Sequence, residues 1–554
     1  MFKIILRNSR KIILGRQKTV MGATFVIFAA TLTSAFLGIW RNRVLSGEFY
    51  ACCTAQLDVY TNAFRIPDML FSMLVMGAFS ASFIPVFARE WSRGKKEAFQ
   101  MASTVITLVL SGFLGVTLLV MIFAKPLSIL IAPGFSGEQI ALMARLMRIM
   151  MISQIFFSVS NFVTAILQAR QRFLVSAFSP VVYNISIILG AKFLSGTWGI
   201  YGPTLGVVLG AFLHLLIQLP VLWKLGFRYV PSFDIKRRGV GQIGKLMLPR
   251  SFSLGLGQLE NLIAATIAST LPVGSVFIFN LAQQLMQLPT RLFGATIGQA
   301  ALPTFARNAA LGKGKELDRI VRQVLIQGFY ISFPVSAIFL VLRLPLVRVA
   351  FGAREFPWAA TLKTAETLAW FAPAIFAQTG IQILVRVYYA LQDTKTPLFI
   401  SLSALLTTIL VSSVLVFGQG WGIAGLSLGI SVGALIQLLQ LLLFLKGKMP
   451  TFSWEKLVSP MMKIIYGSFL AAASSWLGMH YLDRFILNTT RALPTISLTA
   501  LAGALGGGVY LLTTSLLGMR ILPQILEVAK KPFLNGKSRK KTEVMGIGSV
   551  PMEN

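Results

Sequence analysis

The chain has 554 residues, of which 55% are apolar and only 12% charged, and its mean hydropathy is +0.74. A soluble domain has about 25% charged residues, so this composition excludes a soluble multidomain protein, as well as collagen-like, disordered and disulfide-rich secreted chains. It predicts an all-α polytopic membrane protein, with room for about fourteen spans of roughly 21 residues.

Lysine and arginine number 51 against 18 acidic residues, which gives a net charge of +33. That balance is typical of nucleic-acid-binding proteins, but here the basic residues lie between apolar runs, where they set membrane topology. We therefore expect the membrane, and no nucleic acid, as a partner. Cys52 and Cys53 are the two cysteines, and His214 and His480 the two histidines. A disulfide framework, a zinc quartet and histidine-based catalysis are thus excluded, and we expect neither an enzyme nor a resident cofactor or metal.

The first twenty residues are rich in lysine and arginine, which predicts a cytoplasmic N-terminus. The run Met21–Trp40 is too long for the apolar region of a signal peptide and predicts the first membrane helix. Further apolar runs predict spans near 66–88, 101–124, 141–167, 174–194, 199–222, 247–271, 276–304, 320–343, 357–388, 397–417, 421–445, 459–481 and 495–517.

Alternate connections between these spans differ in charge. The basic ones carry Arg89, Arg93, Lys95, Lys96, Arg170, Arg172, Lys224, Arg228, Lys236, Arg237, Arg238, Lys245, Arg307, Lys313, Lys315 and Arg319. The C-terminal tail adds Lys530, Lys531, Lys537, Arg539, Lys540 and Lys541. With an even number of spans, this pattern predicts a multi-pass protein of the bacterial inner membrane with both termini in the cytoplasm.

Three motifs recur in the same order in the two halves of the chain. They are PVFAR at 85–89 and PTFAR at 303–307, Pro126-Leu127 and Pro345-Leu346, and WGIYG at 198–202 and WGIAG at 421–425. The spacing between the two copies is nearly the same for all three motifs. Each copy holds six predicted spans, so both copies enter the membrane in the same direction. We expect two lobes related by a pseudo-two-fold axis along the membrane normal, an arrangement typical of transporters.

The predicted organisation follows from this repeat. It comprises a basic N-terminus at 1–20, an N-terminal lobe at 21–223, a cytoplasmic linker at 224–246, a C-terminal lobe at 247–446, an additional helix pair at 447–517 and a basic tail at 518–554.

Charged residues gather where the first span ends and the second begins: Arg41, Arg43, Asp58, Arg65 and Asp68. A charge inside the hydrocarbon is costly, so such residues tend to face a cavity or a partner. One interpretation is a cavity that binds an anionic substrate, because the planar guanidinium suits phosphate. The other is interfacial snorkelling with arginine–aspartate pairs.

The seventh and eighth spans carry further polar residues. Glu260 lies in a weakly polar run and could bind a cation or a proton, or pair with an arginine. Gln284, Gln287 and Arg291 follow helical spacing and should form one polar stripe facing the bundle interior. This stripe could line a substrate cavity or form hydrogen bonds between helices.

Several motifs resemble one known family. The runs LGIWRNRVL at 37–45, LDVYTNAFRIPDML at 57–70, GAFSASFIPVF at 77–87 and YALQDTKTP at 389–397 are similar to those of the MurJ (MviN) family. Its members are lipid II flippases of the multidrug/oligosaccharidyl-lipid/polysaccharide exporter superfamily, and the resemblance covers about residues 20–450 in order. It implies fourteen helices in two six-helix lobes plus a C-terminal pair, and a cavity in which Arg41 binds the substrate.

The chain also departs from the family pattern. The resemblance places family arginines at Ala35, Phe71 and Gln284, which puts the family's way of holding the diphosphate in doubt. Some members bind sodium through an acidic residue that falls near Ala264, and Glu260, one turn earlier, would lie on the same helix face. The resemblance therefore leaves Na⁺ or H⁺ coupling at Glu260 as a hypothesis.

Three functions follow, in order of preference. The first is a flippase that moves lipid II, or a related polyprenyl-diphosphate lipid, from the inner to the outer leaflet by alternating access, with cell-wall synthesis proteins as further candidate partners. The second is an exporter of another polyprenyl-linked saccharide or a small amphiphile. The third is a non-transporting membrane scaffold whose basic tail recruits cytoplasmic partners or anionic lipid.

Overall fold

The computed structural model describes residues 20–352, 356–450, 452–487, 491–519 and 521. The predicted basic N-terminus and basic tail therefore lie, apart from their innermost residues, outside the described part of the chain. Every regular element among the described residues is helical, which confirms the prediction of an all-α membrane protein.

The first half contains α2 (Val20–Ala63), α3 (Arg65–Phe71), α4 (Gly77–Arg93), α5 (Lys95–Ile122), α6 (Ala124–Ile131), α7 (Gly137–Ala169), α8 (Phe173–Leu189), α9 (Ser195–Trp198), α10 (Tyr201–Leu216) and α11 (Leu219–Lys224). The second contains α12 (Val240–Ser269), α13 (Ser275–Pro289), α14 (Thr296–Ala310), α15 (Gly314–Val341), α16 (Arg343–Phe351), α17 (Trp358–Ala390), α18 (Lys395–Ser413) and α19 (Gly422–Lys448), followed by α20 (Glu455–Phe485) and α21 (Ala492–Leu516). Four π-helical turns interrupt them: η1 (Ser72–Met76), η2 (Gly190–Leu194), η3 (Thr290–Ala295) and η4 (Val414–Gly418).

The helix α7 shows how the sequence specifies a long span. Ser136 accepts a hydrogen bond from the backbone N–H of Gln139, whose side chain accepts one from the Ser136 N–H, so two free donors at the helix start are satisfied. Ile140, Met143 and Met147 follow at helical spacing and are buried, so this face of the helix packs against the interior of the first half.

Ten of the described helical segments are long and apolar enough to cross a membrane. The other four predicted spans coincide with α2, with α3 and α4, with α12, and with α13 and α14. The helix α2 is kinked, π turns separate α3 from α4 and α13 from α14, and α12 is more polar. The count of fourteen stays a prediction.

Backbone irregularities recur at the spacing of the sequence repeat. The π turns η1 and η3 begin at Ser72 and Thr290, which are as far apart as the PVFAR and PTFAR motifs, and η2 and η4 nearly keep the spacing of the WGIYG and WGIAG motifs. Gln171 and Gln392 both adopt positive φ, at 58° and 59°, shortly before α8 and α18. Non-glycine residues seldom adopt this conformation, so its recurrence supports a common plan for the two halves.

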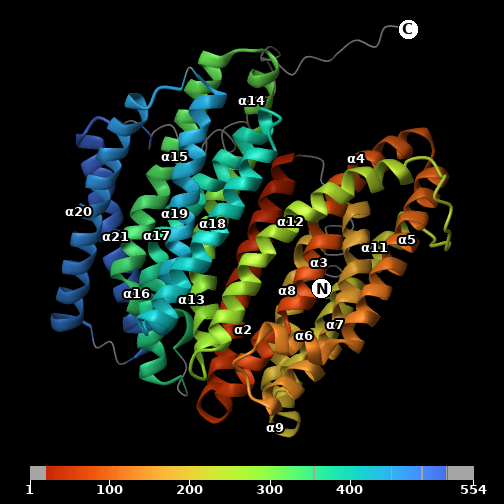
Figure 1. The fold of residues 1–554 in the computed structure, drawn as a ribbon, viewed down its shortest axis with the longest axis horizontal. Coiled ribbons are helices and arrows are strands. Elements are labelled where there is room, and N and C mark those ends of the chain that lie inside the picture. The colour runs from red at the N-terminus through yellow and green to blue at the C-terminus, as the bar shows by residue number, and fades with distance from the viewer. Residues whose placement is uncertain (1–19, 353–355, 451, 488–490, 520, 522–554) are drawn as a thin grey trace, which may run out of the picture.

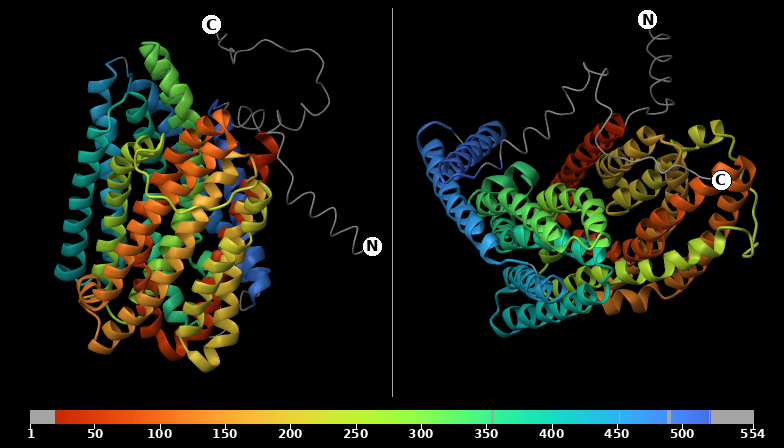
Figure 2. Two further views of the ribbon diagram at one scale, coloured as in Figure 1. Left: turned by 90° about the vertical axis from the view of Figure 1, so that its right-hand side faces the viewer. Right: turned by 90° about the horizontal axis from the view of Figure 1, so that it is seen from above.

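The two halves lie side by side, with α20 and α21 on the outer flank of the second half, where α20 packs against α15 (Figure 1). The helix α12 runs obliquely between the halves and packs against α4 of the first half, although it opens the second (Figure 1; Figure 2). On the other side of the boundary, α2 of the first half contacts α13 and α16 of the second.

Candidate functional site

Arg41 lies where α2, α8 and α13 converge. Its Nε donates to Asn42 Oδ1 at 3.3 Å, and its Nη1 donates to Asn184 Oδ1 of α8 at 3.3 Å. Asn42 Nδ2 in turn donates to Gln284 Oε1 of α13 at 2.5 Å. Gly38, one turn before Arg41, leaves room for this approach, because a Cβ atom there would lie 3.3 Å from Gln284 Nε2. The structure thus brings Arg41 and Gln284 together through Asn42.

The partners of Arg41 determine what it can bind. Both hydrogen-bonded partners are neutral amide oxygens, and no ion pair to Arg41 occurs within the described part of the chain. Because a guanidinium carries five N–H donors, the half-buried Arg41 keeps its charge and further donors for an anion. A planar fork of this kind suits the paired oxygens of a phosphate group.

The other residues of the predicted polar stripe, Gln287 and Arg291, do not contact Arg41 or Asn42 through any hydrogen bond among the described residues. Arg291 Nη2, in the π turn η3, donates to Gln287 Oε1 of the preceding α13 at 2.5 Å. Gln283 Nε2 donates to Asn261 Oδ1 of α12 at 3.2 Å. The glutamines of α13 therefore form hydrogen bonds with both α2 and α12, one helix from each half.

The two asparagines of these contacts occupy equivalent positions of the repeat. The motif LGIWRN at 37–42 of α2 matches LGQLEN at 256–261 of α12, at the same spacing as the two Pro-Leu motifs. Asn42 is therefore equivalent to Asn261, and Arg41 to Glu260. Each asparagine bonds a glutamine of α13. The equivalent asparagines thus both bond α13, one across the halves and one within the second half, and the residues before them carry opposite charges.

Asp58 closes a second contact between the halves. Its Oδ2 accepts the backbone N–H of Gly274 at 2.5 Å and its Oδ1 accepts that of Phe277 at 2.8 Å, and the side chain is 2% exposed. An aspartate is favourable there because the free N–H groups at a helix N-terminus carry partial positive charge. Sequence reasoning placed Asp58 among the cavity residues, whereas the structure places both carboxylate oxygens on the start of α13.

Two further residues extend this contact along α2. Arg43 Nη1 donates to the Val349 carbonyl at 2.9 Å, and Ser46 Oγ donates to the Phe351 carbonyl at 3.4 Å, both on α16. Asn42, Arg43, Ser46 and Asp58, with their partners on α13 and α16, form what we call the α2 seam. The sequence contains one signal for this seam. Gly274, at the start of α13, has no side chain that could cap the helix, so the cap has to come from another residue.

Arg65 and Asp68 lie on α3. Asp68 Oδ1 accepts a hydrogen bond from Gln154 Nε2 of α7 at 3.1 Å. The Nε and Nη2 atoms of Arg65 are buried and have no hydrogen-bond partner. The predicted cavity residue Arg65 is therefore held by packing rather than by a direct bond to Asp68.

Glu260 is half-buried on α12, and no hydrogen bond or ion pair to it occurs among the described side chains. The arginine partner allowed for in the sequence analysis is thus not found there. Ala264, one turn later, is 2% exposed in the core. No group of three or more histidine, cysteine, aspartate or glutamate residues suited to a metal ion is found within the described ranges.

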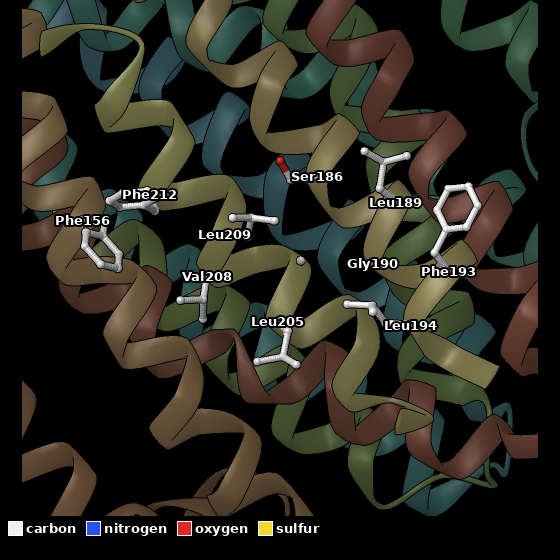
Figure 3. A pocket seen from close by; sticks show the side chains of 11 residues that line it. Phe156, Ser186, Leu189, Gly190, Phe193, Leu194, Leu205, Val208, Leu209 and Phe212 are labelled. Atoms are coloured by element: carbon white, nitrogen blue, oxygen red, sulfur yellow. The ribbon is translucent and has the colours of Figure 1, made fainter. Parts of the chain in front are cut away.

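A cavity of about 650 Å³ lies in the first half, between α7, α8 with η2, and α10 (Figure 3). Its lining is almost wholly apolar and includes Phe156, Leu189, Phe193, Leu209 and Phe212. It is separate from Arg41 and suits hydrocarbon rather than a charged group.

Comparison with known proteins decides the family. The model of the lipid II flippase MurJ family matches residues 51–493 of the chain. The chain belongs to the MurJ family. The probable lipid II flippase MurJ of Bdellovibrio bacteriovorus is 28% identical over 493 residues, covering 87% of this chain and 92% of that protein. The lipid II flippase MurJ of Burkholderia cenocepacia is 29% identical over 432 residues, covering 76% and 83%.

Solved structures show the same fold. A lipid II flippase MurJ in an inward closed conformation has a TM-score of 0.73 and 24% identity, covering 89% of this chain and 98% of that chain. An inward-facing multidrug resistance MATE family transporter of the MOP superfamily has a TM-score of 0.63 and 15% identity, covering 77% and 98%.

The three positions at which the resemblance places MurJ arginines hold neutral residues here. Ala35 lies on α2 before Arg41, and Gln284 accepts the Asn42 hydrogen bond. Phe71 ends α3 and packs on Phe157, with 5.8 Å between the ring centroids. Of the arginine positions that the resemblance compares, this chain keeps the arginine at Arg41.

Proposed function

We propose that the protein moves the lipid-linked peptidoglycan precursor lipid II from the inner to the outer leaflet of the cytoplasmic membrane. Membership of the MurJ family supports this proposal, because relatives with matching length are named lipid II flippases. The observation that carries it is Arg41, a half-buried guanidinium between the halves whose hydrogen-bonded partners are amides. The activity is transport rather than catalysis.

In this proposal the diphosphate of the headgroup binds Arg41 while the polyprenyl tail stays in lipid. The headgroup then crosses as the two halves rock against each other. The α2 seam must break when the substrate leaves on that side, and the contact of α12 with α4 must loosen when it enters from the other. The headgroup would pass between the halves, beside the amide contacts of α13.

We also propose the orientation and location predicted from the basic connections, with both termini in the cytoplasm and the protein in the bacterial inner membrane. Cell-wall synthesis proteins are proposed partners, since they would use the translocated precursor. Transport is further proposed to depend on Na⁺ or H⁺, with Glu260 as the candidate carboxylate on α12. A carboxylate on a predicted membrane span, with no salt-bridge partner among the described residues, is typical of an ion pathway.

Depletion of the protein in its own host tests the function. Lipid II should accumulate in the inner leaflet and become inaccessible to reagents added from outside, while total lipid II rises. Re-expression of the full chain should restore the normal distribution. A normal leaflet distribution after depletion would overturn the proposal.

The neutral residues Ala35, Phe71 and Gln284 favour a second candidate, an exporter of another polyprenyl-linked saccharide or a small amphiphile. With fewer cationic groups the site would bind a diphosphate less tightly, so a less charged substrate becomes more suitable. Binding competition separates the two functions: displacement of labelled lipid II by uncharged amphiphiles at equal concentration would favour the second candidate, and failure to displace it would favour the first.

A further inference from the structure

A cluster of polar side chains lies inside the first half, at the end of α2 and on α3 and α7, which pack against each other and against α2, the helix of Arg41. Asn62 near the end of α2 is followed at helical spacing by Arg65 and Asp68 on α3, and Gln154 and Ser158 lie one turn apart on α7. The 3.1 Å hydrogen bond from Gln154 Nε2 to Asp68 Oδ1 fixes the two rows against each other. We call these five residues the N-half polar cluster.

Most of the polar atoms of this cluster have no partner. Asn62, Gln154 and Ser158 are 0%, 2% and 0% exposed. Both amide atoms of Asn62, the Oε1 of Gln154, the Oγ of Ser158, and the Nε and Nη2 of Arg65 are buried without a hydrogen bond. Unpaired buried polar groups are costly and point to a strain reservoir, an ion or water.

The kinds of atom narrow the choice of ligand. Arg65 presents donors, Gln154 and Asp68 present acceptors, and the amide of Asn62 presents both. A bare metal cation would face the Arg65 guanidinium, and an anion would face the Asp68 carboxylate. A ligand that both donates and accepts hydrogen bonds fits the whole set, and neutral water is such a ligand, through which a proton can pass to a carboxylate. Asp68 is exposed at the edge of the cluster, so a proton can reach its carboxyl group.

Asp68 and Arg41 lie on helices that contact each other, since α3 packs against α2. Arg65 on its own helix and Arg41 on α2 both interact with its charge, as do Tyr60 of α2 and Tyr183 of α8. Glu260 is on α12, which also packs against α3. A negative Asp68 partly offsets the field of Arg41, and a neutral Asp68 does not.

We propose that Asp68 binds a transported or regulatory proton and that this proton strengthens the binding of a prenyl diphosphate at Arg41. Linkage makes the effect reciprocal, because bound diphosphate must raise the proton affinity of Asp68 by the same factor. Proton and anionic headgroup thus bind together. The linkage rests on the proposed function, since it assumes that Arg41 binds diphosphate, but proton binding at Asp68 does not.

The first experiment measures binding of farnesyl diphosphate to the purified full chain across a pH series. Wild type should bind about tenfold more tightly at acidic than at alkaline pH, within the usual range of coupling between sites. Asp68→Asn should bind tightly with a much smaller dependence on pH, and Asp68→Glu should restore the dependence. The titration of the phosphate itself is common to all proteins and cancels in this comparison.

A matched control is Asp318→Asn, which removes a buried aspartate, paired with Arg322 at 2.8 Å and far from Arg41 in the sequence. It should keep the wild-type pH dependence. Gln154→Leu retains Asp68 but removes its donor, so it should displace the midpoint of the pH profile, whereas a merely structural contact would leave the midpoint in place. Equal pH profiles in wild type and Asp68→Asn overturn the proposal.

The second experiment does not need diphosphate binding. Infrared titration of the purified protein should show a carboxylic-acid carbonyl band that is lost in Asp68→Asn and retained in Asp318→Asn. If wild type bound no farnesyl diphosphate at any pH, diphosphate recognition would fail while this band still decided proton binding. A band unchanged in Asp68→Asn, or one abolished by Na⁺ but not by choline, would overturn the proposal in favour of a structural or metal-binding carboxylate.

Discussion

In the proposed mechanism recognition depends on Arg41, whose hydrogen-bonded partners are amide oxygens rather than carboxylates. Asn42 and Asn184 orient the guanidinium without neutralising it. The other positions at which the family pattern has arginines hold Ala35, Phe71 and Gln284. None of these three residues carries a positive charge that could replace that of Arg41.

Replacement of Arg41 should accordingly abolish function. Hydrogen bonds to charged groups contribute about 1.5–3 kcal/mol each, so Arg41→Ala should weaken diphosphate binding by at least about tenfold and fail to complement a depleted strain. Arg41→Lys should complement only partly, because an ammonium is a point charge that does not reproduce the planar fork. Arg145→Ala, on α7, is the control and should complement fully. Full complementation by Arg41→Ala would show that the residue is merely interfacial.

Glu260 permits a sharper distinction between an ion site and a structural role. If it couples transport to an ion, Glu260→Gln should leave the protein folded but abolish the dependence of lipid transport on Na⁺ or on pH. If it is structural, the same change should lower the thermal unfolding temperature and leave the ion dependence as in wild type. Transport assays in liposomes with varied Na⁺ and pH, together with thermal unfolding, check both outcomes.

At the scale of elements, close helix packing depends on glycines that recur in the two halves. A Cβ atom on Gly206 of α10 would lie 2.7 Å from the Ser186 carbonyl oxygen of α8, and one on Gly429 of α19 would meet Ser412 of α18. Backbone cannot yield as a flexible side chain does, so the two pairs of helices can approach this closely only with glycine.

Gly206→Ala should therefore destabilise the first half. Overpacking of this kind costs about 1–3 kcal/mol, which should appear as a lower unfolding temperature in detergent. Gly115→Ala on α5 is the matched control, because no atom lies within 4 Å of the Cβ that it would add. Equal unfolding temperatures for the two variants would contradict the packing argument.

Asp393, in the connection between α17 and α18, should make the thermal stability of the protein fall at acidic pH. Asp393 accepts hydrogen bonds from the backbone N–H and hydroxyl of Thr396 and pairs with Lys448 at the end of α19, at 2.9 Å. Burial opposes ionisation, but the bonds from Thr396 and Lys448 outweigh it and lower the pKa of Asp393 from 3.8 to about 2.

Because this folded-state pKa lies below the unfolded value, the carboxylate stabilises the fold above about pH 4 and loses that effect as the pH falls towards about 2. Wild type should therefore lose thermal stability over this range more steeply than Asp393→Asn. Unfolding temperatures measured at a series of pH values check this. Parallel curves would show that Asp393 contributes nothing to the acid limb.

At the scale of the whole molecule, the α2 seam holds the halves together on one side, and Asp58 is its buried anchor. Asp58→Ala should free two backbone donors of α13, at a cost of about 1–3 kcal/mol for each unsatisfied group. The amides of Gly274 and Phe277 should then exchange hydrogen faster, and the unfolding temperature should fall. Asp234→Asn removes an exposed carboxylate that pairs with Arg237, and should change neither quantity measurably. Unchanged exchange at Gly274 and Phe277 would show that the seam does not depend on Asp58.

The sequence predicted the helical membrane class, the family and the repeat, because apolar periodicity and recurring motifs are local properties that survive in one dimension. It also selected Arg41 and Gln284 separately. It could not show that Asn42 joins them, or that Asp58 binds the start of a helix in the other half, since those contacts depend on how the halves pack. The count of spans was hardest to define where π turns and polar runs break α2 to α4 and α12 to α14.

The matched motifs of α2 and α12 imply a history. Internal repeats arise when the gene for a shorter chain is copied and fused, and the two halves here share motifs and an asparagine that bonds α13. In the shorter ancestor a single gene had to serve both positions, so Arg41 and Glu260 cannot both be original. At least one of these charges arose after the duplication, when each half became free to specialise. The asymmetry of this transporter, with a cation on one side of its axis and an anion on the other, is therefore younger than its scaffold.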